Sequence, residues 1–472
     1  MKELKDLTRK EEFSIICRDY LFPLVGVPYG GAKRIHYKHN GDHFVELKED
    51  GKIFVYEALK GDSCFEILVN KNFPVELISL LDMAMKNINE VRHFNPKRKV
   101  KAKSFLHLIN EFSFAIQKTV CEWITDNDDN YPNVEYLISV LEEWKNKTYE
   151  GKNVNFAFVI DLEKKTNPKD KVFQFDEFLK EEYSATFSDA ITSVILLNKN
   201  LEFVKYRSIT SESVEHDYSV GPLRFADILN GFVEDKIGVI LLSNGDIILA
   251  KDKGIRLVKR EGKWLNFSKD VFASFVSALL DKKEDEDFKN LVEEIYLSAL
   301  DVSFAHSGGI IAYVLDEEEH KLTEPNLYVK LLEKKSIKRM KKPVVHFIDN
   351  LSIAMKPLDE LIDINKRYFN TAETKKRMMK RSFLQKVTGN SEFGKIDRRL
   401  RTELISMDGA TIIKENGKLL AVGAIIQNDS GSYGGGRGAA ARKLSNYGFA
   451  IKISTDGYIE CYKGGDIAFK IK

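Results

Sequence analysis

Near its C-terminal end the chain carries an aspartate on a tight Gly-Ala turn, and this turn opens directly into an apolar β run from Met407 to Ile413. One further strand separates that run from a glycine-rich segment, Gly431 to Arg442, which leads into an expected helix. An exposed carboxylate at the start of a strand can hold a divalent metal. A glycine loop before a helix can offer backbone N–H groups to phosphates. Together the two features predict a site for a metal-bound nucleoside triphosphate.

Composition narrows the class of protein. A length of 472 residues predicts two or three domains, and a formal net charge of +2 provides no global field for nucleic acid or membrane. The four cysteines are widely spaced without a CxxC pair, which suits a reducing compartment. The charged N-terminus lacks the apolar core of a signal peptide, and no apolar run approaches the ~20 residues that span a bilayer. We therefore expect a cytoplasmic protein with no membrane partner.

The pattern of apolar residues predicts a mixed α/β (α+β) fold in three parts. Residues 1–150 read as an α/β region of unknown role, with a hairpin around Gly51 and helices near 74–92, 103–124 and 132–147. Residues 151–284 read as a second α/β region, which ends in an antiparallel meander of short strands starting near Gly238, Asp246 and Gly254.

The third part, residues 285–472, has a more informative order of elements. A helix is expected from Phe288 to about His306, where Gly308 and Gly309 end it, and a buried strand follows. A charged and largely helical insertion, 317–395, precedes the Asp408 turn. The remainder is predicted to be mostly strands, with one helix at 437–447.

This order resembles the diadenylate cyclase domain of the DisA family, which is named for a DNA-integrity scanning protein. The residues that carry the resemblance are 308–314, 407–413, 435–444 and 453–459. It covers roughly 285–472 and implies a twisted central mixed β-sheet flanked by helices. It also implies the family's activity, which joins two ATP molecules into the second messenger cyclic di-AMP with loss of two pyrophosphates. Each 3′-hydroxyl then attacks the α-phosphate of the other nucleotide.

The resemblance also implies roles for individual residues. Asp408 and Asp456 would be the catalytic residues and would bind Mg²⁺ or Mn²⁺, a metal that offsets charge building on the phosphoryl oxygens. The nucleotide-binding residues would be Gly308, Gly309, Gly409, Ala410, Gly435, Gly436, Arg437, Gly438 and Arg442. Two such domains would meet face to face in a homo-oligomer, each holding one ATP. Residues 1–284 would then be a sensory region that controls the cyclase.

One departure from the family opens an alternative function. The family carries Arg-His-Arg where this chain has Arg437, Gly438 and Ala439, so two polar groups that grip the triphosphate are missing. Arg442 and Lys443 lie further along the expected helix and could substitute. Because the loss of one phosphate-clamping charge can cost ~10³-fold in rate, the alternative is a catalytically degenerate module that senses a nucleotide.

Two further sequence patterns could bind other ligands. Basic clusters at 334–342 and 375–381 could attract nucleic acid, while solvated helix faces are the default interpretation of such runs. His36, His39 and His43 form an HxxHxxxH pattern, which could hold a metal only if the three rings converged. The turn between the last two favours an exposed hairpin instead.

Overall fold

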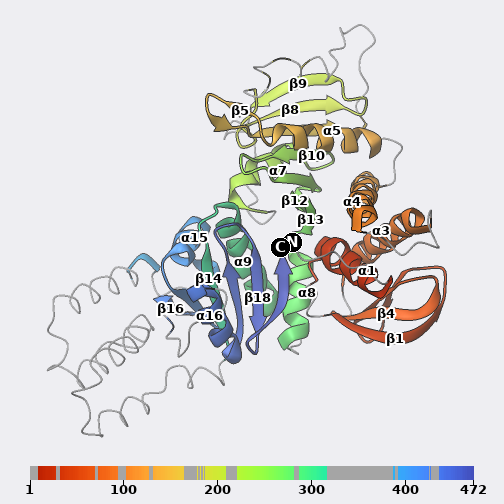
Figure 1. Cartoon of the computed structure of the whole chain (residues 1–472). Helices are drawn as coiled ribbons and strands as arrows, with labels where there is room; N and C mark the ends of the chain where they lie inside the picture. The colour runs from red at the N-terminus through yellow and green to blue at the C-terminus, as the bar shows by residue number, and fades with distance from the viewer. Residues whose placement is uncertain are drawn as a thin grey trace, which may run out of the picture. The chain divides into compact units, whose positions relative to one another are not determined.

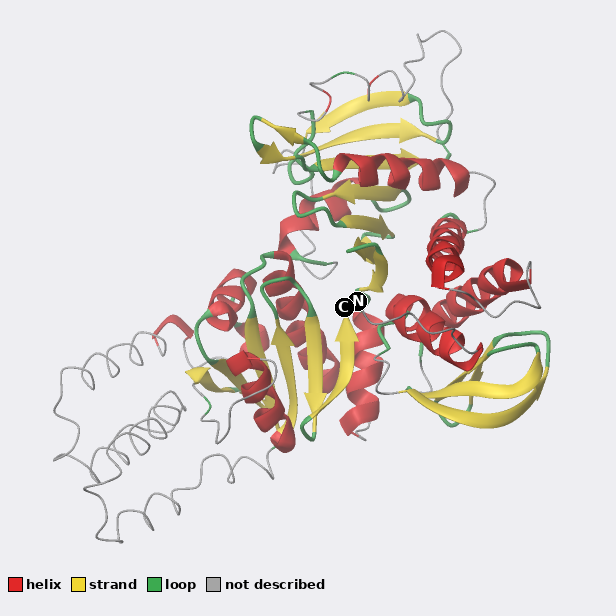
Figure 2. Cartoon of the chain, in the orientation of Figure 1, coloured by secondary structure: helices red, strands yellow, loops and turns green. Residues whose placement is uncertain are grey.

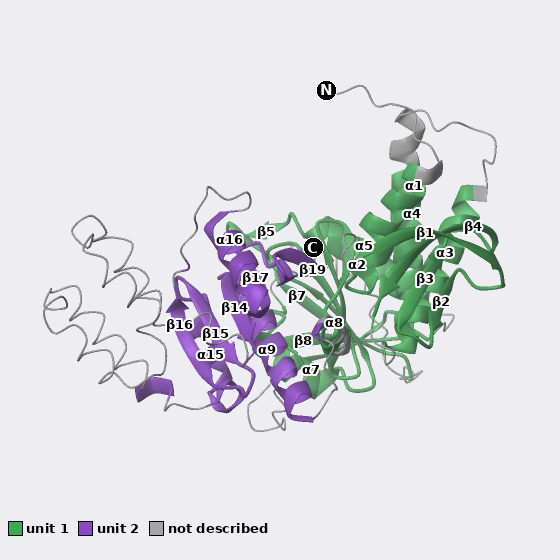
Figure 3. Ribbon diagram, turned by 90° about the horizontal axis from the view of Figure 1, so that it is seen from below, with its two compact units in different colours: residues 1–278, 471–472 green, residues 279–470 purple. Residues whose placement is uncertain are grey.

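The computed structural model divides into two compact units, residues 1–278 with 471–472 and residues 279–470 (Figure 3). The structure describes residues 9–27, 32–69, 73–93, 102–126, 131–163, 178, 181, 184, 187–208, 221–280, 286–315, 386–388, 392–424, 426 and 435–471. Figures 1 and 2 show their helices and strands. Among the helices of these residues, none has the length and apolar composition needed to cross a membrane.

The first unit begins with short helices and a four-stranded antiparallel sheet in the order β1-β4-β3-β2. The helices are α1 (Arg9–Ile16), the π-helix η1 (Cys17–Leu21) and α2 (Phe22–Leu24). The strands are β1 (Ala32–Asn40), β2 (Val45–Lys48), β3 (Lys52–Tyr56) and β4 (Lys60–Leu68). The predicted hairpin is confirmed, because β2 and β3 pair around Gly51, which adopts a φ of 74° that favours glycine.

Three longer helices follow close to their predicted positions. They are α3 (Val75–His93), α4 (Ala102–Ile124) and α5 (Tyr131–Trp144). In α5 the buried residues Val134, Leu137, Ile138 and Leu141 recur at the spacing of one helix face. A two-residue ladder, β5 (Thr148–Tyr149) with β6 (Lys152–Asn153), comes next.

A seven-stranded mixed sheet completes the first unit, in the order β13-β12-β11-β10-β7-β8-β9. Its strands are β7 (Phe156–Asp161), β8 (Ser193–Asn198), β9 (Phe203–Ser208), β10 (Ile237–Leu241), β11 (Ile247–Lys251), β12 (Gly254–Arg260) and β13 (Lys263–Asn266). The helices of this region are η4 (Leu223–Phe225), α7 (Ala226–Phe232) and α8 (Lys269–Leu280). The predicted meander is present, but it is one half of this larger sheet, because β10 also pairs with the fully apolar stretch of β7.

The second unit is built around a six-stranded mixed sheet in the order β16-β15-β14-β17-β18-β19. Its strands are β14 (Gly309–Val314), β15 (Ala410–Lys414), β16 (Leu419–Ala424), β17 (Gly448–Ile453), β18 (Ile459–Lys463) and β19 (Asp466–Ile471). β14 runs parallel to β15 and antiparallel to β17. Every residue of β14 is buried, as expected for a strand covered on both faces.

Helices cover both faces of this sheet, which confirms the predicted α/β class (Figure 3). On one face, α16 (Gly435–Leu444) packs on Ile310 and Ala312 of β14. On the other face, Tyr313 meets Phe288 of α9 (Glu286–Phe304), with ring centroids 6.2 Å apart. Next to α9 lies α15 (Arg398–Ser406), and the short turns are η6 (Phe393–Lys395) and η7 (Ser445–Tyr447). Most of the expected insertion, including both basic clusters, lies outside the described residues.

Candidate functional site

Strand directions gather the predicted site residues at one edge of the second sheet. β14 and β15 both begin there, after Gly308 and Gly409, because the two strands are parallel. β17 ends there, since its last residue, Ile453, pairs with Gly309 of β14. β18 begins there, since its first residue, Ile459, pairs with Ile453. We call this the site edge: the segments 305–309, 406–410 and 453–459, together with the first turn of α16.

Helix α16 starts at the site edge and runs away from it. A Cβ atom on Gly308 would lie 2.6 Å from Nη1 of Arg437, so this guanidinium sits directly against the Gly308 backbone. At the far end of the helix, the carbonyl of Tyr447 accepts a hydrogen bond of 3.0 Å from the N–H of Leu315, just beyond β14. The first-turn N–H groups of α16, which lack partners inside the helix, therefore lie at the site edge together with Arg437.

The two candidate acids flank the start of β14. Asp408 precedes β15 and Asp456 lies in the turn after β17, and both side chains are exposed. Since β14 separates these two strands, their backbones are two strand spacings, ~10 Å, apart. Within the described residues, neither carboxylate has a hydrogen-bond or ion-pair partner. A ligand that touched both acids would therefore lie over Gly308, within reach of Arg437.

Several of the predicted glycines also have a packing role. Gly409 adopts a φ of 104°, and a Cβ there would lie 2.4 Å from the carbonyl carbon of Gly423. A Cβ on Gly309 would lie 2.5 Å from the carbonyl oxygen of Ile405. Ala410 is completely buried in the core beneath α16. Close packing alone thus accounts for small residues at these three positions, and any ligand would meet backbone here.

The remaining predicted residues divide between two places. Gly435 and Gly436 form the first turn of α16, so the helix starts two residues before the predicted position. Gly438 is buried, and apart from its chain neighbours and the backbone of its own helix no described residue lies within 4 Å of a Cβ added there. Arg442 does not join the site edge. It lies in the last turn, with its guanidinium carbon 5.9 Å from the centre of the Tyr462 ring.

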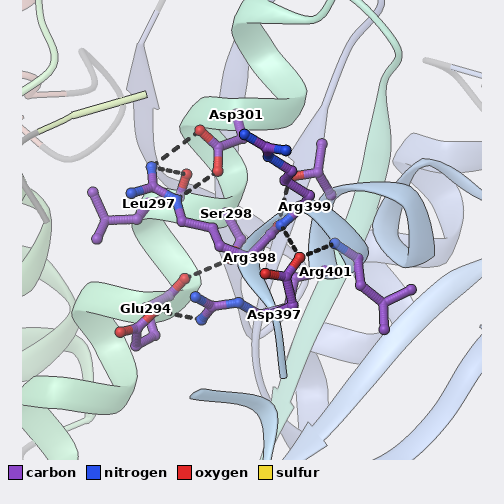
Figure 4. Close-up of polar contacts among 10 residues, drawn as sticks. Glu294, Leu297, Ser298, Asp301, Asp397, Arg398, Arg399 and Arg401 are labelled. Atoms are coloured by element: carbon purple, nitrogen blue, oxygen red, sulfur yellow. Dashed lines mark hydrogen bonds and ion pairs between the residues drawn. The ribbon is translucent and has the colours of Figure 1, made fainter. Parts of the chain in front are cut away.

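A buried ion pair holds together the two helices that lead into the site edge (Figure 4). Arg398 of α15 donates from Nε to Asp301 of α9 at 2.7 Å and from Nη2 to the same carboxylate at 3.0 Å. Asp397 caps the start of α15 by accepting from the N–H groups of Arg399 and Leu400. Arg401 pairs with Glu294, also on α9. These contacts join the start and middle of α15 to the second half of α9.

Hydrogen bonds from the end of α9 reach both acid-bearing loops, a feature that sequence reasoning missed. Ser303 donates to the carbonyl of Gly457, and Nδ1 of His306 lies 3.1 Å from the carbonyl of Thr455. Because a carbonyl only accepts, this Nδ1 carries the proton. The hydroxyls of Ser307 and Ser406 lie 2.8 Å apart. No local pattern signals such bonds, since the partners are far apart in the chain.

The histidines of the first unit do not converge on a metal. His39 is buried, stacks on Tyr56 with ring centroids 3.6 Å apart, and places Nε2 2.9 Å from the carbonyl of His43. Nδ1 of His43 lies 3.2 Å from Asp82, while His36 is largely exposed. Across the described ranges, no group of three or more His, Cys, Asp or Glu side chains is arranged to hold a metal.

The chain matches no protein-family model and no curated protein with which it was compared. The function of the site edge must therefore be inferred from the residues that form it.

Proposed function

We propose that the second unit binds a nucleoside triphosphate with a divalent cation at the site edge, and that it acts as a diadenylate cyclase-like nucleotidyltransferase. The observation that carries this proposal is the convergence of Gly308, Asp408, Arg437 and Asp456 on one sheet edge. The site edge has an exposed acid on each side, the backbone of Gly308 between them and the guanidinium of Arg437 next to that backbone. This arrangement suits a phosphate chain that carries a metal ion.

The carboxylate oxygens at this edge suit Mg²⁺ or Mn²⁺ bound jointly by protein and phosphate. They suit less well a metal ion whose ligands all come from the protein. Two exposed carboxylates, from Asp408 and Asp456, leave most coordination positions to phosphate oxygens and water, which is how Mg²⁺ is commonly bound. When bound, such a metal would offset negative charge on the phosphoryl oxygens. Arg437 would orient the triphosphate from the start of α16, where the helix dipole also favours an anion.

Cyclic product requires a second copy of this chain. One site edge would hold one ATP, so the 3′-hydroxyl and the α-phosphate that react would come from two units facing each other. A homo-oligomer in which the two site edges meet is therefore part of the proposal. Residues 1–284 would supply the controlling region.

The rival proposal is a module that binds the nucleotide without turning it over. Gly438 and Ala439 bring no charged or polar side chain to the helix turn that follows Arg437, where the family has His-Arg. Arg442, the suggested substitute, contacts Tyr462 in the last turn of α16. A nucleotide bound here would meet one guanidinium from this helix, which favours binding over catalysis.

One experiment tests both proposals. The full-length protein is incubated at high concentration with ATP and either Mn²⁺ or Mg²⁺, and the products are analysed by mass spectrometry. We expect cyclic di-AMP and pyrophosphate, and Asp408→Asn should abolish both without unfolding the chain. Asp466→Asn is the matched control, because this exposed acid starts β19 beyond the Gly464-Gly465 turn, at the opposite edge of the same sheet.

The possible results separate the two functions. Intact ATP together with saturable binding, measured by calorimetry, would favour the sensor. Full synthesis by Asp408→Asn would show that Asp408 is not the metal ligand. If the protein neither binds nor converts any nucleoside triphosphate with either metal, both proposals are wrong.

A further inference from the structure

The end of α9 is buried and touches each loop of the site edge. Every residue from Ile295 to Phe304 is buried, so this half of the helix is surrounded by the core. Three residues at or just after its end form hydrogen bonds with other segments. Ser303 and His306 bond to the turn that bears Asp456, and Ser307 bonds to Ser406, the last residue of α15, which lies two positions before Asp408. One short segment thus contacts both acid-bearing loops.

The direction of the Ser307 bond follows from the hydroxyl partners. The Ser406 hydroxyl has one proton, and it donates that proton to the carbonyl of Thr402 at 2.8 Å, inside α15. Ser406 is therefore left to accept, and Ser307 is the donor. His306 adds a constraint of its own, because its φ of 52° lies in the left-handed region that residues other than glycine rarely adopt. The segment is thus held in one conformation between its two targets.

We propose that Ser303 and Ser307 are positioning residues that set the spacing of Asp456 and Asp408 for a shared metal-bound phosphate ligand. This inference rests on the proposed function. Each serine acts through a loop and touches no carboxylate itself: Ser303 holds the carbonyl next to the Asp456 turn, and Ser307 holds the helix end before Asp408. The strands that lead to the two acids, β15 and β17, lie ~10 Å apart with β14 between them. Small movements of either loop would therefore break simultaneous contact with one ligand.

The chain supplies a matched control on the same helix. Ser298 is completely buried, as Ser303 is, but its hydroxyl donates to the Glu294 carbonyl one turn earlier at 2.7 Å. Ser298→Ala removes a buried helix hydroxyl without loosening a site loop. Ser303→Ala and Ser307→Ala remove the same atom and release one loop each, while Ser307→Thr keeps the donor and should restore the parental behaviour.

Two measurements on the full-length variants test the inference. Hydrogen–deuterium exchange without ligand reads the peptides around 403–412 and 453–460, where losing one hydrogen bond should speed exchange roughly threefold to tenfold. Ser307→Ala should affect the first peptide and Ser303→Ala the second. Titration of Mn²⁺ with α,β-methylene-ATP should then show metal affinity roughly tenfold weaker for either variant than for Ser298→Ala.

The outcomes distinguish this inference from the proposed function. If exchange in both peptides matches that of Ser298→Ala, the serines do not position the loops, and the inference is overturned whether or not a nucleotide binds. Faster exchange with parental metal affinity would overturn it as well, since the spacing would not matter to the ligand. Faster exchange in a protein whose parent binds neither Mn²⁺ nor the analogue would refute the proposed function, and with it the role of the serines in spacing the acids for a ligand, although the loop contacts themselves would stand.

Discussion

Removal of one partner from the buried pair between Asp301 and Arg398 should strongly destabilise the second unit. Only 4% of the Asp301 side chain and 8% of the Arg398 side chain are exposed, and two hydrogen bonds of 2.7 and 3.0 Å join them. Asp301→Asn keeps the shape but removes the negative charge that faces the buried guanidinium. Breaking such a pair typically costs about 3–5 kcal/mol. For a unit of this size we expect the melting temperature to fall by about 6–20 °C.

Thermal unfolding of the full-length chain, followed by calorimetry, measures this change. The matched control is Glu392→Gln, which removes a largely exposed pair with Lys395 at 2.9 Å and should cost less than about 0.5 kcal/mol. Replacing both buried partners, Asp301→Leu with Arg398→Met, should recover most of the loss, because no unpaired charge remains. A loss below about 1 kcal/mol for Asp301→Asn would refute the reasoning, since the carboxylate would then not be the required partner.

Two more predictions concern the same unit. Gly409→Ala should destabilise it by about 2–4 kcal/mol, because the new Cβ would lie 2.4 Å from the Gly423 carbonyl carbon in a left-handed backbone. The control Gly417→Ala, where the nearest neighbour of the new Cβ is 3.9 Å away, should cost about 1 kcal/mol. Equal losses of unfolding free energy in denaturant would contradict this prediction. Burial opposes ionisation of Glu460, but hydrogen bonds from Lys470, Lys452 and Tyr462 outweigh it and lower its pKa to about 2. Since the pKa is lower in the folded state, the carboxylate stabilises the fold above pH 4.5, and this stability should disappear as the pH falls toward 2. Glu460→Gln should flatten that part of the stability curve, and an unchanged slope would contradict the assignment.

Local sequence patterns were sufficient to predict most individual elements. The apolar runs of β14 and β7 are buried on both faces, and the helical spacing of apolar residues in α5 places one face in the core, while the second half of α9 is buried on every side. These signals depend only on neighbours within a turn or two along the chain. The start of α16 was predicted two residues late, because its first turn consists of glycines, which weaken the helix signal.

The composition of the candidate site was only partly accessible from the sequence. Asp408 is predicted from its place at the start of a strand, whereas Arg437 and Asp456 follow from the resemblance to the cyclase family. The sheet does bring all three to one edge with Gly308. Arg442 is expected to substitute for the phosphate-binding groups that the family has after Arg437, yet the helix carries it to the opposite end, over Tyr462. Its distance along α16 from Arg437 decides this, since each residue advances a helix by ~1.5 Å.

What the sequence by itself determined was therefore the type and approximate position of the elements, since hydrophobic periodicity and turn residues act locally. Only the tertiary structure decided which ends of those elements meet. The contact between Ser303 and Gly457 joins residues 154 positions apart, and it exists because β14 pairs with β17 in one register. The predicted meander likewise becomes part of the seven-stranded sheet because β10 pairs with β7. Strand order, direction and register depend on contacts between residues far apart in the chain, because they are set by the burial of whole apolar sheet faces. No short stretch of sequence encodes them.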